Sequence, residues 1–161
     1  MNLTARQLLQ GGFRQRMLAL LAEHGVDPSQ VKVEITERIF AENGELVDAA
    51  MDEMRRQGLE FMMDDFGTGY SNLSSMLQMP FSYVELDKSL MDDIACDPKA
   101  RLVASTLVPF FHKLGQTVVA EGIETKGQAD IVLGLGADRI QGFYYAKPMP
   151  ADELARWYCR K

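Results

Sequence analysis

The sequence has few of the residues that build disulfide frameworks, zinc sites or histidine-based active sites. It contains two cysteines and two histidines in 161 residues. Cys96 and Cys159 stand far apart and lack metal-site spacing, so we interpret them as reduced thiols of a cytoplasmic protein. His24 and His112 are equally isolated, and His112 lies in an expected helix. We therefore interpret His112 as a surface or packing residue rather than a catalytic base.

Long apolar runs and an excess of basic charge are missing too. No stretch approaches the roughly 20 apolar residues of a membrane span, and the start carries no signal-peptide pattern. The net charge of −6 argues against a general binder of DNA or of anionic membranes. A length of 161 residues suits one domain, residues 1–161, with a sizeable core.

Strand-like and helix-like segments alternate along the chain. We expect strands at 31–36, 59–65, 83–87, 117–123 and 139–143, and helices at 5–23, 46–57, 71–79, 99–114, 127–135 and 151–159. This alternation predicts a parallel sheet with helices outside it. Polar or acidic residues stand at nearly every strand end, which favours a barrel, because a barrel gathers all its strand ends at one mouth. An open sheet would gather only the strands around its switch point.

The most informative segment is the end of the second expected strand. An apolar run stops at Asp64 and Asp65, and a loop with Gly67 and Gly69 follows. Adjacent strand residues face opposite ways, so the two aspartates can share a metal site only where the strand gives way to a loop. The glycines supply the backbone freedom for that change.

Carboxylates from other strand ends join this pair. Glu34, Glu85, Asp87 and Glu121 also stand at or near strand ends. Glu34, Asp64, Asp65 and Glu121 gathered at one mouth would repel one another unless a cation lay among them, and Mg²⁺ or Mn²⁺ suits such oxygen ligands. Paired cations of this kind can hydrolyse a phosphodiester. The alternative is that these carboxylates cap the helices that follow them.

Four segments in order resemble the EAL domain family of cyclic di-GMP phosphodiesterases. They are Glu34-Ile35-Thr36-Glu37, Asp64-Asp65-Phe66-Gly67-Thr68-Gly69-Tyr70-Ser71, Ala120-Glu121-Gly122-Ile123-Glu124-Thr125, and Gln141-Gly142-Phe143 with Lys147-Pro148. The resemblance extends from Asn2 to about Pro150. It implies a TIM-like (β/α) barrel and a metal-dependent hydrolysis of cyclic di-GMP to linear pGpG.

The resemblance also implies roles for single residues. The positions that match metal ligands are Asn2, Glu34, Asp64 and Asp65. Glu121 matches a glutamate near the metal and the attacking water, and Gln141 a glutamine at the same mouth. Glu37 matches the anchor of a loop that shapes the substrate site and often lies at a dimer interface. The substrate and loop positions are Phe66, Gly67, Thr68, Gly69, Tyr70, Ser71 and Pro148.

One departure from the family pattern concerns the barrel. The Glu-Ala-Leu signature precedes, in the family, the asparagine that Asn2 matches, together with the first strands. We therefore expect a partial barrel of about five mostly parallel strands, lacking the first strands and corresponding to about two-thirds of the family fold. Apolar strand residues would then meet water and favour a homo-oligomer that covers the opening, or a longer parent. They are Val33, Ile35, Phe61, Met63, Val84 and Val118.

A second departure concerns the chemistry. Glu85 stands where the family carries a catalytic lysine, which adds negative charge where a phosphodiester anion would bind. We expect a domain that is catalytically impaired or inactive and that acts by binding a protein or cyclic di-GMP. The alternatives are a fragment of an active phosphodiesterase completed by another segment or chain, and a remnant that only self-associates. Retention of Mg²⁺ or Mn²⁺ stays open, and Glu85 is a candidate substitute ligand.

Overall fold

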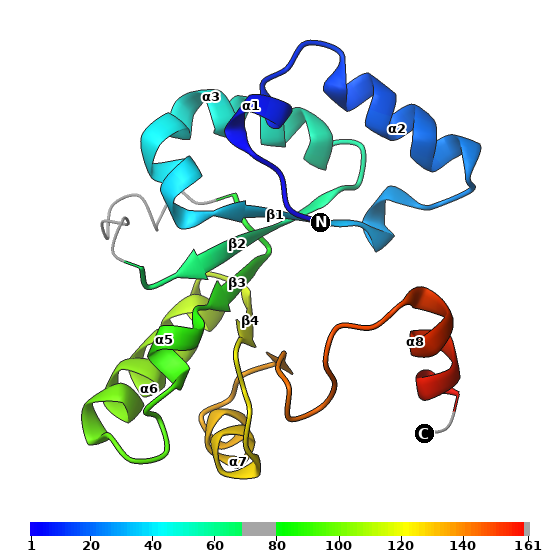
Figure 1. Ribbon diagram of the computed structural model, residues 1–161. Coiled ribbons are helices and arrows are strands. Elements are labelled where there is room, and N and C mark those ends of the chain that lie inside the picture. The colour runs from blue at the N-terminus through cyan, green and yellow to red at the C-terminus, as the bar shows by residue number, and fades with distance from the viewer. Residues whose placement is uncertain (69–79, 160–161) are drawn as a thin grey trace.

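Five parallel strands form one sheet whose order follows the order of the chain (Figure 1). The computed structural model describes residues 1–68 and 80–159. The strands are β1 (Lys32–Thr36), β2 (Glu60–Phe66), β3 (Tyr83–Leu86), β4 (Thr117–Ala120) and β5 (Arg139–Ile140). Because the order β1-β2-β3-β4-β5 never reverses, the sheet has no switch point, which is the topology of a barrel segment. Asn2 extends the sheet beyond β1 through a parallel bridge to Glu34.

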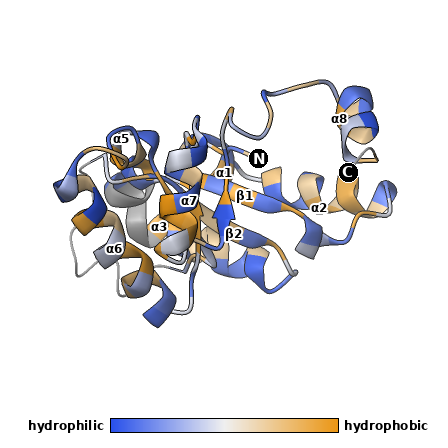
Figure 2. Ribbon diagram, turned by 90° about the horizontal axis from the view of Figure 1, so that it is seen from below, coloured by the Kyte–Doolittle hydropathy of each residue, from blue (hydrophilic) through white to orange (hydrophobic). Residues whose placement is uncertain are grey.

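Among the described residues, two helices precede β1, the helices between the strands cover one face of the sheet, and a last helix stands apart (Figure 1). The helices are α1 (Ala5–Leu8), α2 (Phe13–Glu23), α3 (Glu37–Arg55), α5 (Lys88–Met91), α6 (Pro98–Lys113), α7 (Lys126–Gly134) and α8 (Ala151–Tyr158), with a 3₁₀ turn, η1, at Pro28–Gln30. Hydrophilic and hydrophobic residues alternate along these helices, as expected for a layer with one face toward solvent (Figure 2). No described helix is both long and apolar enough to cross a bilayer.

Two expected helix boundaries are wrong, and one expected helix cannot be compared. The helix expected at 5–23 is divided, because Gly12 takes a left-handed conformation with φ 78° and the second half begins after it. The helix expected at 46–57 already begins at Glu37, where the Thr36 side chain caps it by accepting from the Ile39 N–H. The helix expected at 71–79 lies outside the described residues.

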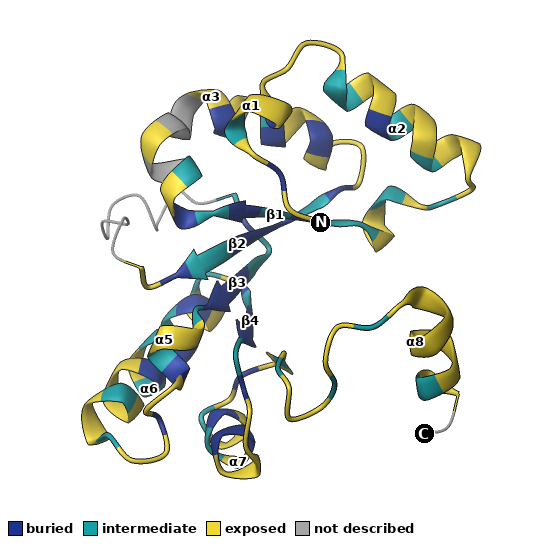
Figure 3. Ribbon diagram, in the orientation of Figure 1, coloured by how far each residue is buried: buried dark blue, intermediate teal, exposed yellow. Residues whose placement is uncertain are grey.

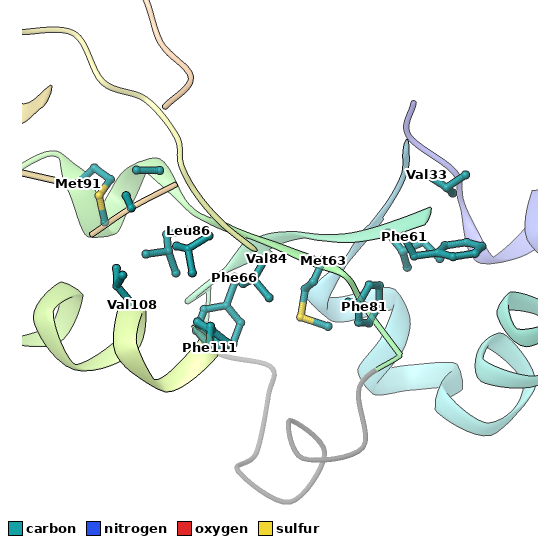
Figure 4. Packing of buried hydrophobic residues seen from close by; sticks show 14 of the residues in the cluster. Val33, Phe61, Met63, Phe66, Phe81, Val84, Leu86, Met91, Val108 and Phe111 are labelled. Atoms are coloured by element: carbon teal, nitrogen blue, oxygen red, sulfur yellow. The ribbon is translucent and has the colours of Figure 1, made fainter. Parts of the chain in front are cut away.

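The apolar core lies between the sheet and its helices, and this overturns the expectation that the strand residues meet water. Side chains at alternate positions of β1 to β4 are fully buried there (Figures 3 and 4). They are Val33, Ile35, Phe61, Met63, Val84 and Val118, each 0% exposed. The prediction failed because it assigned the apolar positions to the inside of the barrel. The register places them together on the face that the helices cover, which we call the outer face.

The opposite face of the sheet, here called the inner face, carries polar and charged residues at both ends of the strands, with Met62 and Val119 between them. At the amino-terminal ends of the strands it carries Lys32, Glu60, Tyr83 and Arg139, a group that we call the floor. Lys32 pairs with Glu60, and the Tyr83 ring lies between the two cations, with Lys32 Nζ 4.8 Å and Arg139 Cζ 5.1 Å from its centroid. These contacts are cation–π in geometry, and the ion pair with Lys32 compensates the charge of Glu60.

The C-terminal segment differs from the rest of the chain. Helix α8 stands apart from the other helices and has no buried residue (Figures 1 and 3). Cys159 directly after it and Cys96 are both exposed free thiols, in keeping with the expected absence of a disulfide. His112 contacts Asp138, with 2.8 Å between its Nε2 and Asp138 Oδ2, and so acts as a packing residue between α6 and the loop before β5.

Candidate metal centre at the carboxyl ends of the strands

A β-bulge places both aspartates of the second strand at the carboxyl end of the sheet. Met63 pairs with Val84 and Phe66 with Leu86, so two residues of β2, Asp64 and Asp65, stand opposite one residue of β3. Asp65 adopts φ 57°, a left-handed conformation that aspartate tolerates better than most residues. The expectation that the strand has already given way to a loop is therefore wrong. The strand continues to Phe66, and the bulge within it brings both aspartates to the same end of the sheet.

The residue opposite the bulge is Glu85. Its neighbours Val84 and Leu86 point to the buried outer face, so Glu85 points to the inner face. The side chain is only 3% exposed, and its Oε1 has no hydrogen-bond partner among the described residues. Burial, reinforced by the charges of Asp64 and Glu121, raises the pKa of Glu85 to about 8.

Three carboxylates converge beside this position. One oxygen each from Asp65, Asp87 and Glu121 lies within 4.8 Å of the others, and all three side chains are half-buried. They come from β2, from the residue after β3 and from the residue after β4. A hard divalent cation takes oxygen ligands of this type. We call Asp64, Asp65, Glu85, Asp87 and Glu121 together the acidic mouth.

Asp87 is the member of this cluster that the expected ligand set lacked. Its place at a strand end could have indicated a metal ligand. The sequence was equally consistent with a residue that caps the following helix. Both apply, because Asp87 Oδ1 accepts from the Ser89 N–H at 2.9 Å and caps α5, while a carboxylate has a second oxygen for another partner. The capping alternative thus holds for Asp87, whereas the caps of α3 and α7 are Thr36 and Thr125.

The charges of the mouth have no basic partner within it. In the ranges 1–68 and 80–159, no ion pair joins a lysine or arginine to any of its five carboxylates. Lys88 pairs with Glu124 and, at 3.8 Å, with Asp92, and its charge partly offsets the rise in the pKa of Glu121. Burial first and neighbouring carboxylates second raise the pKa of Asp64 and that of Glu121. A bound cation would remove this repulsion.

Asn2 and Glu34 lie at the neighbouring edge of the sheet. Asn2 bridges β1 beside Glu34, and Glu34 points to the inner face because Val33 and Ile35 point to the outer one. The charge of Glu34 raises the pKa of Asp64 and of Glu85 in minor part. The structure thus brings Glu34 into the electrostatic range of the mouth, while the three-carboxylate cluster forms without it.

The loop after β2 begins with an anchored turn. Glu37 Oε2 accepts from the Gly67 N–H at 2.9 Å, which is the contact expected of an anchoring glutamate. Gly67 has φ 109°, and a Cβ there would lie 2.5 Å from Leu90 Cδ1, so both conformation and space require glycine. Thr68 donates its hydroxyl to the Asp65 carbonyl at 3.1 Å. Gly69, Tyr70 and Ser71 lie outside the described residues.

Phe66 has a different place from the one expected. We assigned it to the substrate loop, but it is the last residue of β2 and is 4% exposed. Its ring packs edge-on against Phe111 of α6, with 4.9 Å between the centroids (Figure 4). Phe66 therefore belongs to the core that holds the bulge against the helices.

A cavity of about 520 Å³ adjoins the mouth and contains the remaining expected residues. Glu121, Gln141 and Pro148 line it together with Lys88, Gly122, Glu124, Gly142, Phe143, Ala146, Lys147, Met149 and Leu154. Gln141 is held by two backbone bonds, from its N–H to the Ala120 carbonyl at 2.9 Å and from the Ile123 N–H to its carbonyl at 3.1 Å. A Cβ on Gly142 would lie 2.1 Å from the Ile123 carbonyl oxygen, so only glycine permits this close approach.

Comparison with known proteins agrees with this geometry. The family model of the EAL domain matches residues 1–148. The chain is 33% identical over 159 residues to the cyclic di-GMP phosphodiesterase PdeR of Escherichia coli, covering 99% of this chain and 24% of PdeR. The chain thus spans about a quarter of that relative.

Solved structures show the same fold. The EAL domain of Mycobacterium smegmatis DcpA superposes with a TM-score of 0.92 at 28% identity, over 99% of this chain and 71% of that one. The complex of Klebsiella pneumoniae BlrP1 with manganese and cyclic di-GMP superposes with a TM-score of 0.87 at 28% identity, over 92% and 38% of the two chains. The match over nearly the whole chain, together with the bulged aspartate pair at the strand ends, shows that the chain belongs to the EAL domain family.

Proposed function

We propose that this chain binds cyclic di-GMP through a divalent cation at the acidic mouth and does not hydrolyse it. Family membership supports the ligand class, since PdeR is a cyclic di-GMP phosphodiesterase and BlrP1 has been solved with manganese and cyclic di-GMP. The cavity beside the mouth supports a nucleotide site. Lys88 and Lys147 line it, and Lys147 Nζ lies 5.5 Å from the centroid of the Phe143 ring.

The observation that carries the loss of hydrolysis is the buried Glu85. An uncompensated carboxylate stands at the place where the family resemblance leads us to expect a lysine. A cationic side chain there would stabilise the charge that develops on the phosphoryl oxygens. Losing one such group typically costs about 2.7–4 kcal/mol of transition-state stabilisation, a hundred- to thousand-fold in rate. A cation can still join the mouth to a phosphate, so binding can survive without turnover.

A turnover assay and a binding titration test the two halves of this proposal separately. With MnCl₂ and cyclic di-GMP, we expect no pGpG above the buffer blank, and clear pGpG production would overturn the loss of hydrolysis. Calorimetry with cyclic di-GMP is expected to show binding with Mn²⁺ and weaker binding with EDTA. No heat of binding in either condition would leave a protein-binding role.

The second candidate function is a hydrolase whose site is completed by further polypeptide. The converging oxygens of Asp65, Asp87 and Glu121 support it, because a metal-dependent hydrolase would hold its cation with oxygen ligands of this kind. The discriminating sample is a longer polypeptide that carries this sequence. Production of pGpG by that polypeptide, and its loss on Asp65→Asn, would favour the hydrolase.

Self-association stays a prediction, and its basis has changed. The strand residues first expected to drive it are buried, but the C-terminal segment exposes large apolar side chains. They include Phe143, Tyr144, Tyr145, Leu154 and Tyr158. Apolar groups gathered on an exposed segment favour association. A monomer by light scattering at micromolar concentration would contradict this prediction.

A further inference from the structure

The structure contains an unsatisfied acceptor in the acidic mouth, opposite the bulged aspartates and beside the cluster of Asp65, Asp87 and Glu121. Glu85 is almost completely buried, with 3% of its surface exposed. Its Oε1 lacks a hydrogen-bond partner in the described part of the chain. Most buried polar atoms in proteins are hydrogen-bonded, and a buried carboxylate is costly without a partner. The atom therefore requires an explanation in terms of a partner that binds there.

We propose that Glu85 is itself a ligand of the divalent cation in this chain, together with carboxylates of the acidic mouth. The inference rests on the proposed function in taking the mouth as the cation site, and it goes further in assigning Glu85 a role. The register places Glu85 directly opposite the bulged pair Asp64 and Asp65. Its side chain interacts electrostatically with Asp64, Glu121, Glu34 and Asp65, which are all acidic.

The chemistry of the neighbours selects a cation as the missing partner. The charged groups that influence Glu85 most are all carboxylates, and none can donate a proton to it while ionised. Mg²⁺ and Mn²⁺ accept several carboxylate oxygens at once, which satisfies the Glu85 oxygen and offsets the repulsion among its neighbours. The simple alternative is a protonated Glu85 that is merely buried and has no part in binding.

The test measures cation binding directly, without nucleotide. Mn²⁺ is titrated into the protein by calorimetry, and free Mn²⁺ is followed in parallel by electron paramagnetic resonance. We expect the wild-type chain to bind Mn²⁺ and Glu85→Gln to bind it at least about tenfold more weakly, as for the loss of a group that supports a metal site. Glu60→Gln is the matched control, since it removes a glutamate from the same sheet face at the floor, and its affinity should equal that of wild type.

Two results would overturn the inference. Equal Mn²⁺ affinity of wild type and Glu85→Gln would make Glu85 a buried residue without a ligand role. Absence of Mn²⁺ binding by wild type would remove the site altogether. Neither result depends on cyclic di-GMP, so the nucleotide titration of the proposed function can succeed or fail independently.

Folding of the variant is checked by circular dichroism in EDTA. Glu85→Gln replaces a buried carboxyl group by a neutral amide of the same volume, so we expect it to fold. If it does not, Glu85→Asp retains the charge but withdraws the carboxylate by one methylene group. It should then bind Mn²⁺ more weakly than wild type, and an affinity equal to wild type would again contradict the ligand role.

Discussion

The floor and the acidic mouth lie at opposite ends of the same strands, yet they hold their glutamates in opposite ways. At the floor, the hydrogen bond from Lys32 outweighs burial and lowers the pKa of Glu60. At the mouth, burial and neighbouring carboxylates raise the pKa of Glu85 to about 8. At the floor a lysine of the same sheet pairs with the glutamate, whereas at the mouth the proposed cation would supply the missing positive charge. This difference separates a structural end of the sheet from a binding end.

The largest expected effect follows from the charge of Glu85 without metal. Its folded pKa of about 8 lies above the ordinary 4.5, so the folded state holds a proton that the unfolded state has lost between these values. Stability of the wild-type chain in EDTA should therefore fall as the pH rises through this window, by up to about 1.4 kcal/mol per pH unit. Glu85→Gln should lose this part of the slope and be the more stable protein at about pH 9.

Urea unfolding in EDTA at several pH values measures this effect. Glu60→Gln serves as the control, because the pKa of Glu60 is lowered and its removal should not abolish the loss of stability between about pH 5 and pH 8. Superimposable pH profiles for wild type and Glu85→Gln would show that burial does not perturb this carboxyl group as described.

The second prediction restores the missing partner of the mouth. Mn²⁺ at about 100 times its dissociation constant should stabilise the wild-type chain by about 2.7 kcal/mol. Asp65→Asn should lose most of this gain, because it removes a charged oxygen from the cluster with Asp87 and Glu121. Asparagine tolerates the left-handed φ of 57° at this position, so the bulge should persist.

Thermal unfolding with and without Mn²⁺ gives the measurement. Glu60→Gln at the floor should keep the full Mn²⁺ effect, which controls for the loss of any acidic residue. An undiminished Mn²⁺ effect in Asp65→Asn would place the cation elsewhere and would remove the functional contrast between the two ends.

The third prediction concerns the loss of the Lys32–Glu60 ion pair at the floor. Lys32→Met removes the partner of Glu60 and the cation beside Tyr83, and should destabilise the chain by about 0.5–1 kcal/mol, because the pair is partly exposed. Since the pKa of Glu60 is lowered, the stabilisation is present above its unfolded value and is lost as the pH falls through the folded one. Chemical denaturation at neutral and acid pH should show the penalty shrinking in acid. A penalty independent of pH would assign it to lost packing.

The sequence could predict the parallel sheet and the gathering of carboxylates at one end of it because both depend on local patterns. Alternating segments identify the strands, and acidic residues at their ends identify the mouth. The direction in which each strand faces was predicted wrongly. The alternation of Val33, Glu34 and Ile35 separates two faces but does not say which one the helices cover.

The bulge in β2 was the other feature that the alternation of polar and apolar residues could not predict. Adjacent residues on a regular strand cannot share a face, and the pairing that breaks this rule depends on β3 as well as on β2. Asp87 was missed as a member of the cluster for a similar reason. Its capping of α5 can be predicted from neighbouring residues in the sequence. Its approach to Asp65 and Glu121 depends on where three different strands end.

The smallest expected effect is that of salt, and it separates the causes at the two ends. Raising NaCl from about 0.1 to 1 M shortens the screening length from about 10 to 3 Å. At about pH 9 in EDTA, the penalty of Lys32→Met should shrink by a few tenths of a kcal/mol, because a partly exposed ion pair is screened. The gain from Glu85→Gln should change less, because burial rather than charge repulsion is the main cause of its raised pKa, and salt does not relieve burial. Each difference is taken against wild type at the same salt concentration, which cancels general salt effects on folding. A larger salt response for Glu85→Gln than for Lys32→Met would mean that repulsion dominates at the mouth and that solvent ions reach it freely.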